Sequence, residues 1–486
     1  MIYLVTNQQQ LFDNPAYSIM SVEESIKEMS SWSVIQLDTE TTGRDAHLCD
    51  LLCVQFGNDK ADKRIVVDCS TVNIIRYASI LESKLCILQN AKFDLQFFYN
   101  YGIIIRKVYD TMIVEQLLHL GWPSGQISYA LNAIAERRLG INIDKSVRGE
   151  IIWRGLDTTV INYAAGDVTY LEKIMHSQKE DLKKQELLRA AKIECDFIPA
   201  IAYLEWCGIH LDRTKWETKM KKDKVLLDKA KQALDDFIIS RDDFKQYVHV
   251  NTQGDLFEGY DLTPKCTVNW SSSQQVTKIA KQLGFDTSVK DKKTGEDKES
   301  VLEKHLKPQK GICDEFLKLY FDYQEHFKVV SSFGQGHLNA INPKTDRIHT
   351  VYKQLGAASG RMSCGSQQPN TDLAKVNKVN PANCTYPNMQ QLPADDATRG
   401  SFTAPLGYEW CSCDYSALES RLGADIYNEK SMLDEFLHGS GDMHSLCAYM
   451  VYKDDIPRDT PIKDIKKKYA HLRKAVKPIE LNGEDS

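Results

Sequence analysis

The sequence predicts an α/β domain of about 150 residues followed by a larger, mostly helical region. Two observations indicate this. Short apolar runs bounded by polar turns, typical of buried strands, crowd the first hundred residues or so. From about residue 186 onward, long charged segments with apolar residues at helical spacing take over. The length of 486 residues suits roughly two to four domains of about 100–200 residues each.

The strands of the first domain are predicted from four apolar runs. They lie at residues 32–38, 51–57, 64–68 and 85–89. A helix follows within residues 129–139, with Ser128 as its predicted N-cap. Another is predicted to begin near Thr159 and to extend through Leu171. This order of mixed strands and then helices is typical of an α/β domain.

The second half alternates long helices with irregular stretches. Helices are predicted at 192–206, ending at Cys207-Gly208, at 213–239 and at 315–332, and strands at 347–355 and 409–413. Residues 242–310 are more polar, and 291–299 is the most loop-like stretch. Helical patterns resume after the last strand and continue to residue 486.

Composition sets limits on location and chemistry. Apolar residues make up 42% of the chain, but no apolar run approaches the roughly 18–20 residues needed to cross a bilayer, and no signal peptide is recognisable. The thirteen cysteines are scattered without metal-site spacing, which favours reduced thiols in a cytoplasm. The net charge of −6 leaves nucleic-acid binding to be decided by the motifs.

Four carboxylates and a tyrosine form the first candidate site. Asp38 and Glu40 lie two apart at the end of a predicted strand, so both side chains point to one face. Asp94 lies at the start of a helix after another strand. Tyr163 and Asp167 are four apart, on one face of a later helix. Each pattern alone is more often a solvated turn or chance, and their shared order carries the interpretation.

Acidic groups gathered in one place repel each other unless cations neutralise them. Ligands that offer only oxygen favour hard ions, here Mg²⁺ or Mn²⁺. Two such ions about 3.5–4 Å apart can activate a water molecule and stabilise the leaving oxygen of a phosphodiester. The sequence therefore predicts a two-ion phosphodiesterase site.

The segments that carry these residues resemble the DEDD exonucleases of the tyrosine subgroup, which have a ribonuclease H-like fold. The similar segments are DTETTG, NAKFDL and YAAGDVTYL, within about residues 31–185, and Asp110-Thr111 resembles a further family element. The resemblance implies removal of nucleotides from single-stranded 3′ ends. It also implies that Asn90 steadies the substrate strand.

The resemblance also implies a role for each acidic residue. Asp38, Glu40 and Asp167 would hold the ion that carries the attacking water. Asp38 would be shared with a second ion, which Asp94 would hold, and Tyr163 would orient the water. Both ions would be Mg²⁺ or Mn²⁺.

Further segments resemble family A, polymerase I-like DNA polymerases. They lie in the family order at 203–212, 268–285, 347–364 and 386–393. The first two resemble elements of the thumb domain, and the last two resemble blocks that lead into the palm. This resemblance implies that Arg361, Gln390 and Arg399 contact the DNA substrate.

The segment CSCDYSALESR, residues 411–421, resembles polymerase motif A. The resemblance places Asp414 at the end of a strand as a ligand of the catalytic ions, and Tyr415 beside it as a backbone-carbonyl ligand. Glu419 would select deoxynucleotides by blocking a ribose 2′-hydroxyl. Arg421 would be structural or position the substrate.

The last part resembles two later family elements. The segment GDMHS supplies His444, and HLRKAVKPI begins like motif B, with Arg473 and Lys477 expected to grip the triphosphate of a deoxynucleotide. Pro478 is expected to break the motif B helix. A motif C with the second catalytic aspartate is not recognisable in the sequence.

The chain departs from the family at four places. Ser359 stands for a threonine, Ala417 for a glutamine and Ser420 for a leucine. Residues 365–384 form an insertion between two blocks that the family joins closely, and its expected location is near the primer-template path.

We therefore interpret the chain as five regions in series. They are an N-terminal segment at 1–30, the exonuclease domain at 31–185, a thumb-like helical region at 186–345, a partial α+β palm at 346–428, and the start of the fingers at 429–486.

The first functional hypothesis is a proofreading exonuclease joined to an incomplete family A polymerase core. A separate chain would complete the core, or the gene would be truncated or interrupted. The expected partners are primer-template DNA, single-stranded 3′ ends, deoxynucleotides and that second chain, in a bacterial or phage-infected cytoplasm. One alternative is a free-standing exonuclease similar to RNase D that uses its second half to hold DNA. Another is a non-catalytic DNA-binding subunit.

Overall fold

The computed structural model describes residues 1–486 except 10–13, 123–124, 144–145, 251–262, 292–294 and 484–486, and except the side chains at 146, 148 and 477–483. The chain divides into two compact units, Met1–Pro405 and Leu406–Ser486. The boundary between them falls inside the predicted palm range of 346–428.

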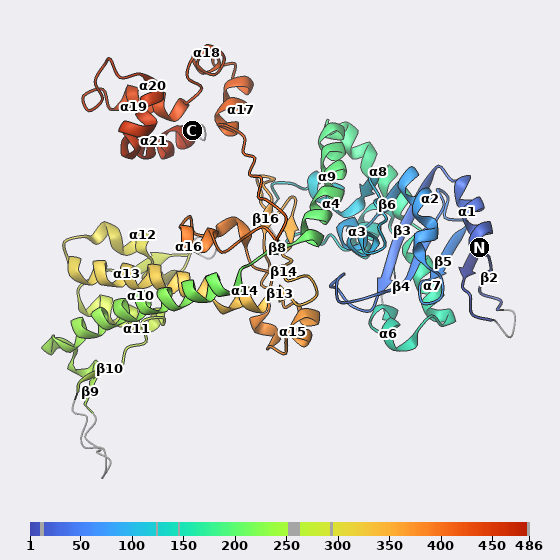
Figure 1. Cartoon of the computed structure of the whole chain (residues 1–486), viewed down its shortest axis with the longest axis horizontal. Helices are drawn as coiled ribbons and strands as arrows, with labels where there is room; N and C mark the ends of the chain where they lie inside the picture. The colour runs from blue at the N-terminus through green and yellow to red at the C-terminus, as the bar shows by residue number, and fades with distance from the viewer. Residues whose placement is uncertain (10–13, 123–124, 144–145, 251–262, 292–294, 484–486) are drawn as a thin grey trace, which may run out of the picture. The chain divides into compact units, whose positions relative to one another are not determined.

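A seven-stranded sheet organises the first part of unit 1 (Figure 1). Its strands are β1 (Ile2–Val5), β2 (Ser18–Ile19), β3 (Val34–Thr41), β4 (Leu51–Gly57), β5 (Arg64–Asp68), β6 (Leu85–Leu88) and β7 (Val108–Asp110), in the spatial order β2-β1-β5-β4-β3-β6-β7. The central strand β3 pairs antiparallel with β4 and parallel with β6. The predicted strands are confirmed, and the N-terminal segment adds β1 to the same sheet beside β5.

Helices cover both faces of this sheet. They are α1 (Val22–Ser30), α2 (Ala78–Ser83), α3 (Ala91–Tyr99), α4 (Thr111–Leu118), α5 (Leu131–Leu139), α6 (Ile151–Arg154), α7 (Thr158–Asp167), α8 (Leu171–Lys184) and α9 (Leu188–Cys207). Ile35 and Leu37 of β3 share one core with α1, α2 and α3. On another face, Ala164 of α7 packs in a separate core that includes Cys53 of β4. Because side chains alternate between the two faces of a strand, the sheet has a separate core on each face.

Two sequence predictions in this region are wrong. Ser128 does not cap α5, which begins at Leu131 after Ala130 without a side-chain cap, because the Ser128 hydroxyl lies instead 3.4 Å from the Ala130 amide. The helix that carries Asp167 ends at that residue, and Leu171 begins the separate helix α8. The apolar periodicity continued across this break because both helices pack into cores of the same domain.

The rest of unit 1 is mainly helical (Figure 1). Its helices are α10 (Arg213–Ile239), α11 (Ser273–Gln282), α12 (Glu303–Leu306), α13 (Asp314–Ser332), α14 (Gln335–Asn339), α15 (Thr371–Asn377) and α16 (Asp396–Arg399). The long helices α10 and α13 pack side by side, and the buried rings of Trp270 and Phe316 lie in the same core as Leu234. The helix predictions at 192–206, 213–239 and 315–332 are confirmed.

Short strands complete unit 1. They are β8 (Ile209–His210), β9 (Val248–His249), β10 (Lys265–Cys266), β11 (Ser288–Lys290), β12 (Asp297–Glu299), β13 (Ile341–Asn342), β14 (Arg347–Ile348), β15 (Tyr352–Lys353) and β16 (Ser363–Cys364). The stretch 291–299, predicted as loop, ends in β12, which pairs antiparallel with β11. Backbone hydrogen bonds between β11 and β12 stabilise this strand although its residues are charged and typical of loops.

Unit 2 contains α17 (Leu418–Ile426), α18 (Lys430–His438), α19 (Met443–Val451), α20 (Ile462–Lys468) and α21 (Ala470–Gly483). Ala448, Ile456, Ile465 and Val476 form its small core. In the described parts of the chain, no helix is both long and apolar enough to cross a membrane.

Two predictions for unit 2 are also wrong. Residues 409–413 are not a strand but an exposed irregular segment. A strand needs a neighbour for its backbone groups, and among the described residues none pairs with this segment. Pro478 does not end the helix, because α21 continues to Gly483. A proline removes one helical hydrogen bond and bends or breaks a helix, and here the helix persists.

A buried ion pair joins the sheet domain to the rest of unit 1. Glu205 of α9 is only 3% exposed and accepts from Lys92 at 2.6 Å and from Gln96 at 2.8 Å, both on α3. The Tyr352 amide of β15 also donates to Glu205, and its carbonyl accepts from Lys92. Burial raises the pKa of Glu205, and the charge of Lys92 opposes this rise.

We expect Glu205→Ala to lower the free energy of unfolding by about 1–3 kcal/mol, because the partly buried Lys92, Gln96 and the Tyr352 amide would lose their shared acceptor. Urea unfolding followed by circular dichroism measures this change. The control is Glu180→Ala, which removes the exposed partner of Lys183 and should leave the unfolding midpoint unchanged. Equal effects of the two substitutions would contradict the structural role of Glu205.

Candidate active site

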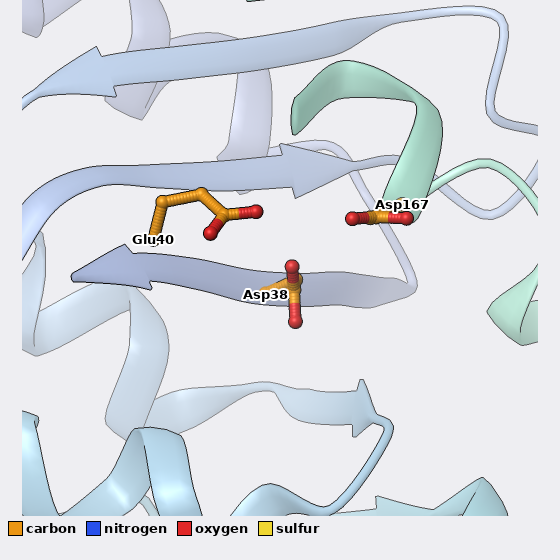
Figure 2. Close-up of side chains that lie close together, drawn as sticks. All are labelled: Asp38, Glu40 and Asp167. Atoms are coloured by element: carbon orange, nitrogen blue, oxygen red, sulfur yellow. The ribbon is translucent and has the colours of Figure 1, made fainter. Parts of the chain in front are cut away.

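Strand β3 presents two carboxylates on one face of the sheet. Asp38 and Glu40 alternate with Leu37 and Thr39, and Leu37 points into the core on the opposite face. Asp167, at the last residue of α7, completes the group. One carboxylate oxygen from each of the three residues lies within 4.8 Å of the others. Figure 2 shows the three side chains converging between β3 and the end of α7.

Helix α7 is placed by its cap and by its packing. Asp157 caps its first turn by accepting from the Val160 amide at 2.8 Å. Ile161 and Ala164 bury the helix against the sheet, so its last residue, Asp167, lies over β3. Tyr163, one turn earlier and half-buried, is on the same side of the helix as Asp167.

A neighbouring strand orients the Asp38 carboxylate. Gln55 of β4 lies directly opposite Asp38 in the ladder and donates to its Oδ2 at 2.8 Å. The Gln55 side chain is fully buried, so its amide dipole is fixed. One oxygen of Asp38 is therefore held by the protein while the carboxylate faces Glu40 and Asp167.

Asp94 is the fourth predicted carboxylate and lies at the first turn of α3. It is 2% exposed and accepts from the Thr39 hydroxyl at 2.6 Å. Burial raises the pKa of Asp94 well above its ordinary value, and the nearby charge of Asp38 raises it further. Asp94 is thus close to Asp38 but outside the group of three.

A single carboxylate, Asp110, holds the start of α3 in place. It accepts from the amides of Asn90 and Ala91 at 3.0 and 2.7 Å, and it caps α4 through the amides of Met112 and Ile113. These bonds fix the turn between β6 and α3. Asn90 there adopts a left-handed backbone with φ of 61°, which is uncommon outside glycine but tolerated by asparagine.

The donor set of the site fits a hard divalent ion. Asp38, Glu40 and Asp167 offer only oxygen, at spacings that a single cation can bridge. Without a cation, three carboxylates this close would repel strongly.

The structure brings three of the four predicted carboxylates, Asp38, Glu40 and Asp167, close together, and it adds side chains that the sequence did not indicate. Gln55 is the clearest case, and its signal is a polar residue in the middle of the buried apolar run 51–57. Thr39, between Asp38 and Glu40 on β3, gave no signal of its own. Its position on the opposite face of the strand is what brings it to Asp94.

The predicted polymerase residues of unit 1 flank the insertion 365–384 in the sequence. Gln390 donates to the Met362 carbonyl at 3.2 Å, which brings it next to Arg361. Arg399, at the end of α16, donates to the Pro393 carbonyl at 3.2 Å. The side chains of Arg361, Gln390 and Arg399 are exposed.

The predicted motif A residues lie in unit 2. Asp414 and Tyr415 belong to the exposed segment before α17, and Glu419 is exposed on the first turn of that helix. Arg421 donates to the Ser416 carbonyl at 3.0 Å and lies 4.4 Å from the centre of the Phe436 ring. Arg421 therefore ties the motif A segment to α17 and α18.

The predicted motif B arginine makes an ion pair within unit 2. Arg473 of α21 donates to both carboxylate oxygens of Asp442, at 2.9 and 3.2 Å. Burial raises the pKa of Asp442, but the bonds from Arg473 and Ser445 outweigh this and lower it. His444 is half-buried in α19, two residues after Asp442. The side chain of Lys477 is outside the described residues.

Comparison with known proteins finds a different family match for each of the two halves of the chain. Residues 17–183 match the protein family described as 3′-5′ exonuclease, and residues 256–470 match the family described as DNA polymerase family A. In solved structures, the chain is similar to the POL domain of Pol1 from M. smegmatis in complex with DNA primer-template and dNTP. That likeness has a TM-score of 0.66 over 94% of this chain and 69% of that chain, at 20% identity, and shows a shared fold.

Two curated relatives are bacterial DNA polymerases I. The protein from Aquifex aeolicus is 27% identical over 88% of this chain, and the protein from Pseudomonas aeruginosa is 26% identical over 93%. The chain spans 66% of the first relative and 46% of the second.

The chain therefore carries a 3′-5′ exonuclease domain at residues 17–183, followed by a region of the DNA polymerase family A at residues 256–470. The predicted fold class, an α/β exonuclease domain followed by polymerase elements, is confirmed.

We expect the chain to bind Mn²⁺ at this site. Asp38→Asn, Glu40→Gln and Asp167→Asn should each weaken binding at least about tenfold, because each removes a charged oxygen ligand. Titration followed by the electron paramagnetic resonance signal of free Mn²⁺ measures the affinity. Glu136→Gln, on the exposed side of α5, is the matched control. Unchanged Mn²⁺ affinity in all three site variants would contradict the metal site.

Proposed function

We propose that this chain removes nucleotides from the 3′ ends of DNA with its N-terminal domain and contributes to DNA synthesis with the remainder. The observation that carries the nuclease proposal is the convergence of Asp38, Glu40 and Asp167 on one point of space. The match of residues 17–183 to the 3′-5′ exonuclease family supports the same reaction.

Each residue has a role in this proposal. Asp38, Glu40 and Asp167 hold one divalent ion, Mg²⁺ or Mn²⁺, and Asp38 and Asp94 hold a second. Ions bound there supply an activated water and neutralise the leaving oxygen of the phosphodiester. Tyr163, one turn before Asp167 on α7, orients that water.

The substrate strand enters beside the start of α3. Asn90 contacts it there, where Asp110 fixes the backbone. The expected products are nucleoside monophosphates, and single-stranded ends are the preferred substrate.

The polymerase part of the proposal rests on the family A match over residues 256–470. Asp414 and the Tyr415 carbonyl bind the catalytic ions, and Glu419 selects deoxynucleotides. Arg361, Gln390, Arg399, Arg421, His444, Arg473 and Lys477 contact primer-template DNA or the incoming deoxynucleotide. To contact the deoxynucleotide, Arg473 must leave Asp442 or bind both groups at once.

Polymerisation needs a second metal-binding carboxylate from a separate motif. The proposal therefore includes further residues that bring this carboxylate, either on the same polypeptide or on a partner chain. The match to the polymerase family favours this function over a free-standing exonuclease. The acidic cluster favours it over a non-catalytic DNA-binding subunit. A cytoplasmic location stays a prediction.

With Mg²⁺, the chain should shorten single-stranded DNA from its 3′ end. Asp38→Ala and Asp94→Ala should abolish this reaction, because each removes a ligand from the site. Gel analysis of a 5′-labelled oligonucleotide measures the shortening, and Glu136→Ala is the surface control. Continued digestion by both site variants would refute the assignment.

Primer extension tests the second half separately. The 486-residue chain should not extend a primer until a polypeptide that carries the second catalytic carboxylate is added. Extension after that addition should be lost in Asp414→Asn, while the exonuclease reaction is kept. Extension by the 486 residues alone would overturn this part of the proposal.

A further inference from the structure

The insertion 365–384 forms a closed loop on the surface of unit 1. Its two ends meet in an antiparallel bridge, where Ser366 and Tyr386 exchange backbone hydrogen bonds of 2.9 and 3.1 Å. Nearby, the Thr350 hydroxyl donates to the Pro387 carbonyl at 2.5 Å. The blocks before and after the insertion are thus held together, and the insertion projects from a fixed base.

The far side of the insertion is anchored to the region of α14 and β13. Asn377 donates to the carbonyls of Asn339 and Ile341, at 2.9 and 3.0 Å. Asn339 returns a bond of 2.9 Å to the Asn383 carbonyl. Leu373, inside α15, is buried together with Leu48 of the exonuclease domain.

The near side of the insertion contacts the loop that follows the metal-binding strand. Residues 42–50 join β3 to β4, directly after Glu40 and Thr41. Asp372 of α15 accepts from the amides of Arg44 and Asp45, at 2.7 and 3.2 Å. Its carboxylate therefore satisfies two backbone donors in a loop that begins two residues after a predicted metal ligand.

The contact is close enough to constrain the sequence of the loop. A Cβ atom at Gly43 would lie 3.0 Å from both carboxylate oxygens of Asp372 and 2.5 Å from the Cys49 sulfur. Within the loop, the Thr42 amide donates to the Asp50 carbonyl and the Asp50 amide donates to the Thr42 hydroxyl, both at 2.9 Å. These bonds close the base of the loop, next to the end of β3.

The remaining side of the loop has other supports. His47 contacts the Trp206 carbonyl at 2.8 Å, and Asn100 donates to the Ala46 carbonyl at 2.5 Å. These contacts hold residues 46 and 47. Among the described residues, Asp372 is the side chain from outside the exonuclease domain that holds the amides of Arg44 and Asp45.

We infer that the insertion is a brace for the exonuclease site, with Asp372 as a positioning residue for Glu40. By holding the loop after β3, Asp372 keeps the Glu40 carboxylate in register with Asp38 and Asp167. The inference rests on the proposed exonuclease function, and it gives residues 365–384 a role at the nuclease site instead of on the primer-template path.

The test compares Asp372→Ala, which removes the Oδ2 acceptor of both amides, with Asp372→Asn, which keeps one carbonyl oxygen as an acceptor. Exonuclease rates on single-stranded DNA are measured over a range of Mg²⁺ concentrations. Asp372→Ala should raise the half-saturating Mg²⁺ concentration about tenfold, as expected for loss of a group that orients a ligand. The rate at saturating Mg²⁺ should change less, and Asp372→Asn should restore most of the affinity.

Two controls separate this effect from unfolding. Lys375→Ala, exposed on the same helix, should match the wild type. Thermal melting shows whether each variant is folded at the assay temperature, and Asp372→Ser replaces Asp372→Ala if that variant is unfolded. Amide hydrogen exchange gives a readout that does not depend on activity, since Arg44 and Asp45 should lose protection in Asp372→Ala.

The outcomes are distinct. Suppose that the wild type is active and that a folded Asp372→Ala or Asp372→Ser variant has the same Mg²⁺ dependence. This result would overturn the brace but not the proposed exonuclease function. A wild-type chain without nuclease activity would overturn the proposed function, and the brace would fall with it. A raised Mg²⁺ requirement that Asp372→Asn corrects supports the brace.

Discussion

The repulsion among three closely spaced carboxylates is the constraint on which the account of this structure depends. Asp38, Glu40 and Asp167 converge within 4.8 Å of one another, an arrangement that costs free energy unless a cation is bound. The surrounding protein nevertheless holds them in place. Gln55 holds Asp38 from the next strand, and the packing of α7 on the sheet brings in Asp167. Such a cluster of oxygen ligands fits the proposed site for a divalent cation.

The proximity of Asp38, Glu40 and Asp167 could be predicted in part from the sequence, because local periodicity decides which side chains share a face. The period of two along β3 places Asp38 and Glu40 on one face, and the helical period places Tyr163 and Asp167 together. Asp94 follows a strand at the start of a helix, as expected. The long-range contacts could not be predicted this way. Gln55 reaches Asp38 only through strand pairing.

The predictions that failed concern elements whose conformation depends on partners outside their own segment. Residues 409–413 have the composition of a strand, but the structure shows them exposed and without a neighbouring strand among the described residues. Ser128 has a capping side chain, but the helix begins two residues too late to use it. The insertion 365–384 is a case in which a contact formed that its own sequence did not predict. Its polar composition gave no hint that Asp372 reaches a loop more than three hundred residues earlier in the chain.

Two further buried carboxylates connect the nuclease site to the rest of the molecule. Asp110 fixes the turn before Asp94, and Glu205 fastens the helix that carries Asp94 to α9 and β15. The geometry of the site is thus built from both parts of unit 1.

Anomalous X-ray diffraction from crystals grown with Mn²⁺ would test the central claim most directly. The account predicts an anomalous peak within coordination distance of carboxylate oxygens from Asp38, Glu40 and Asp167, with a second peak between Asp38 and Asp94 when a nucleotide is bound. Crystals with the three side chains in place but without anomalous density between them, at Mn²⁺ concentrations that saturate activity, would contradict it.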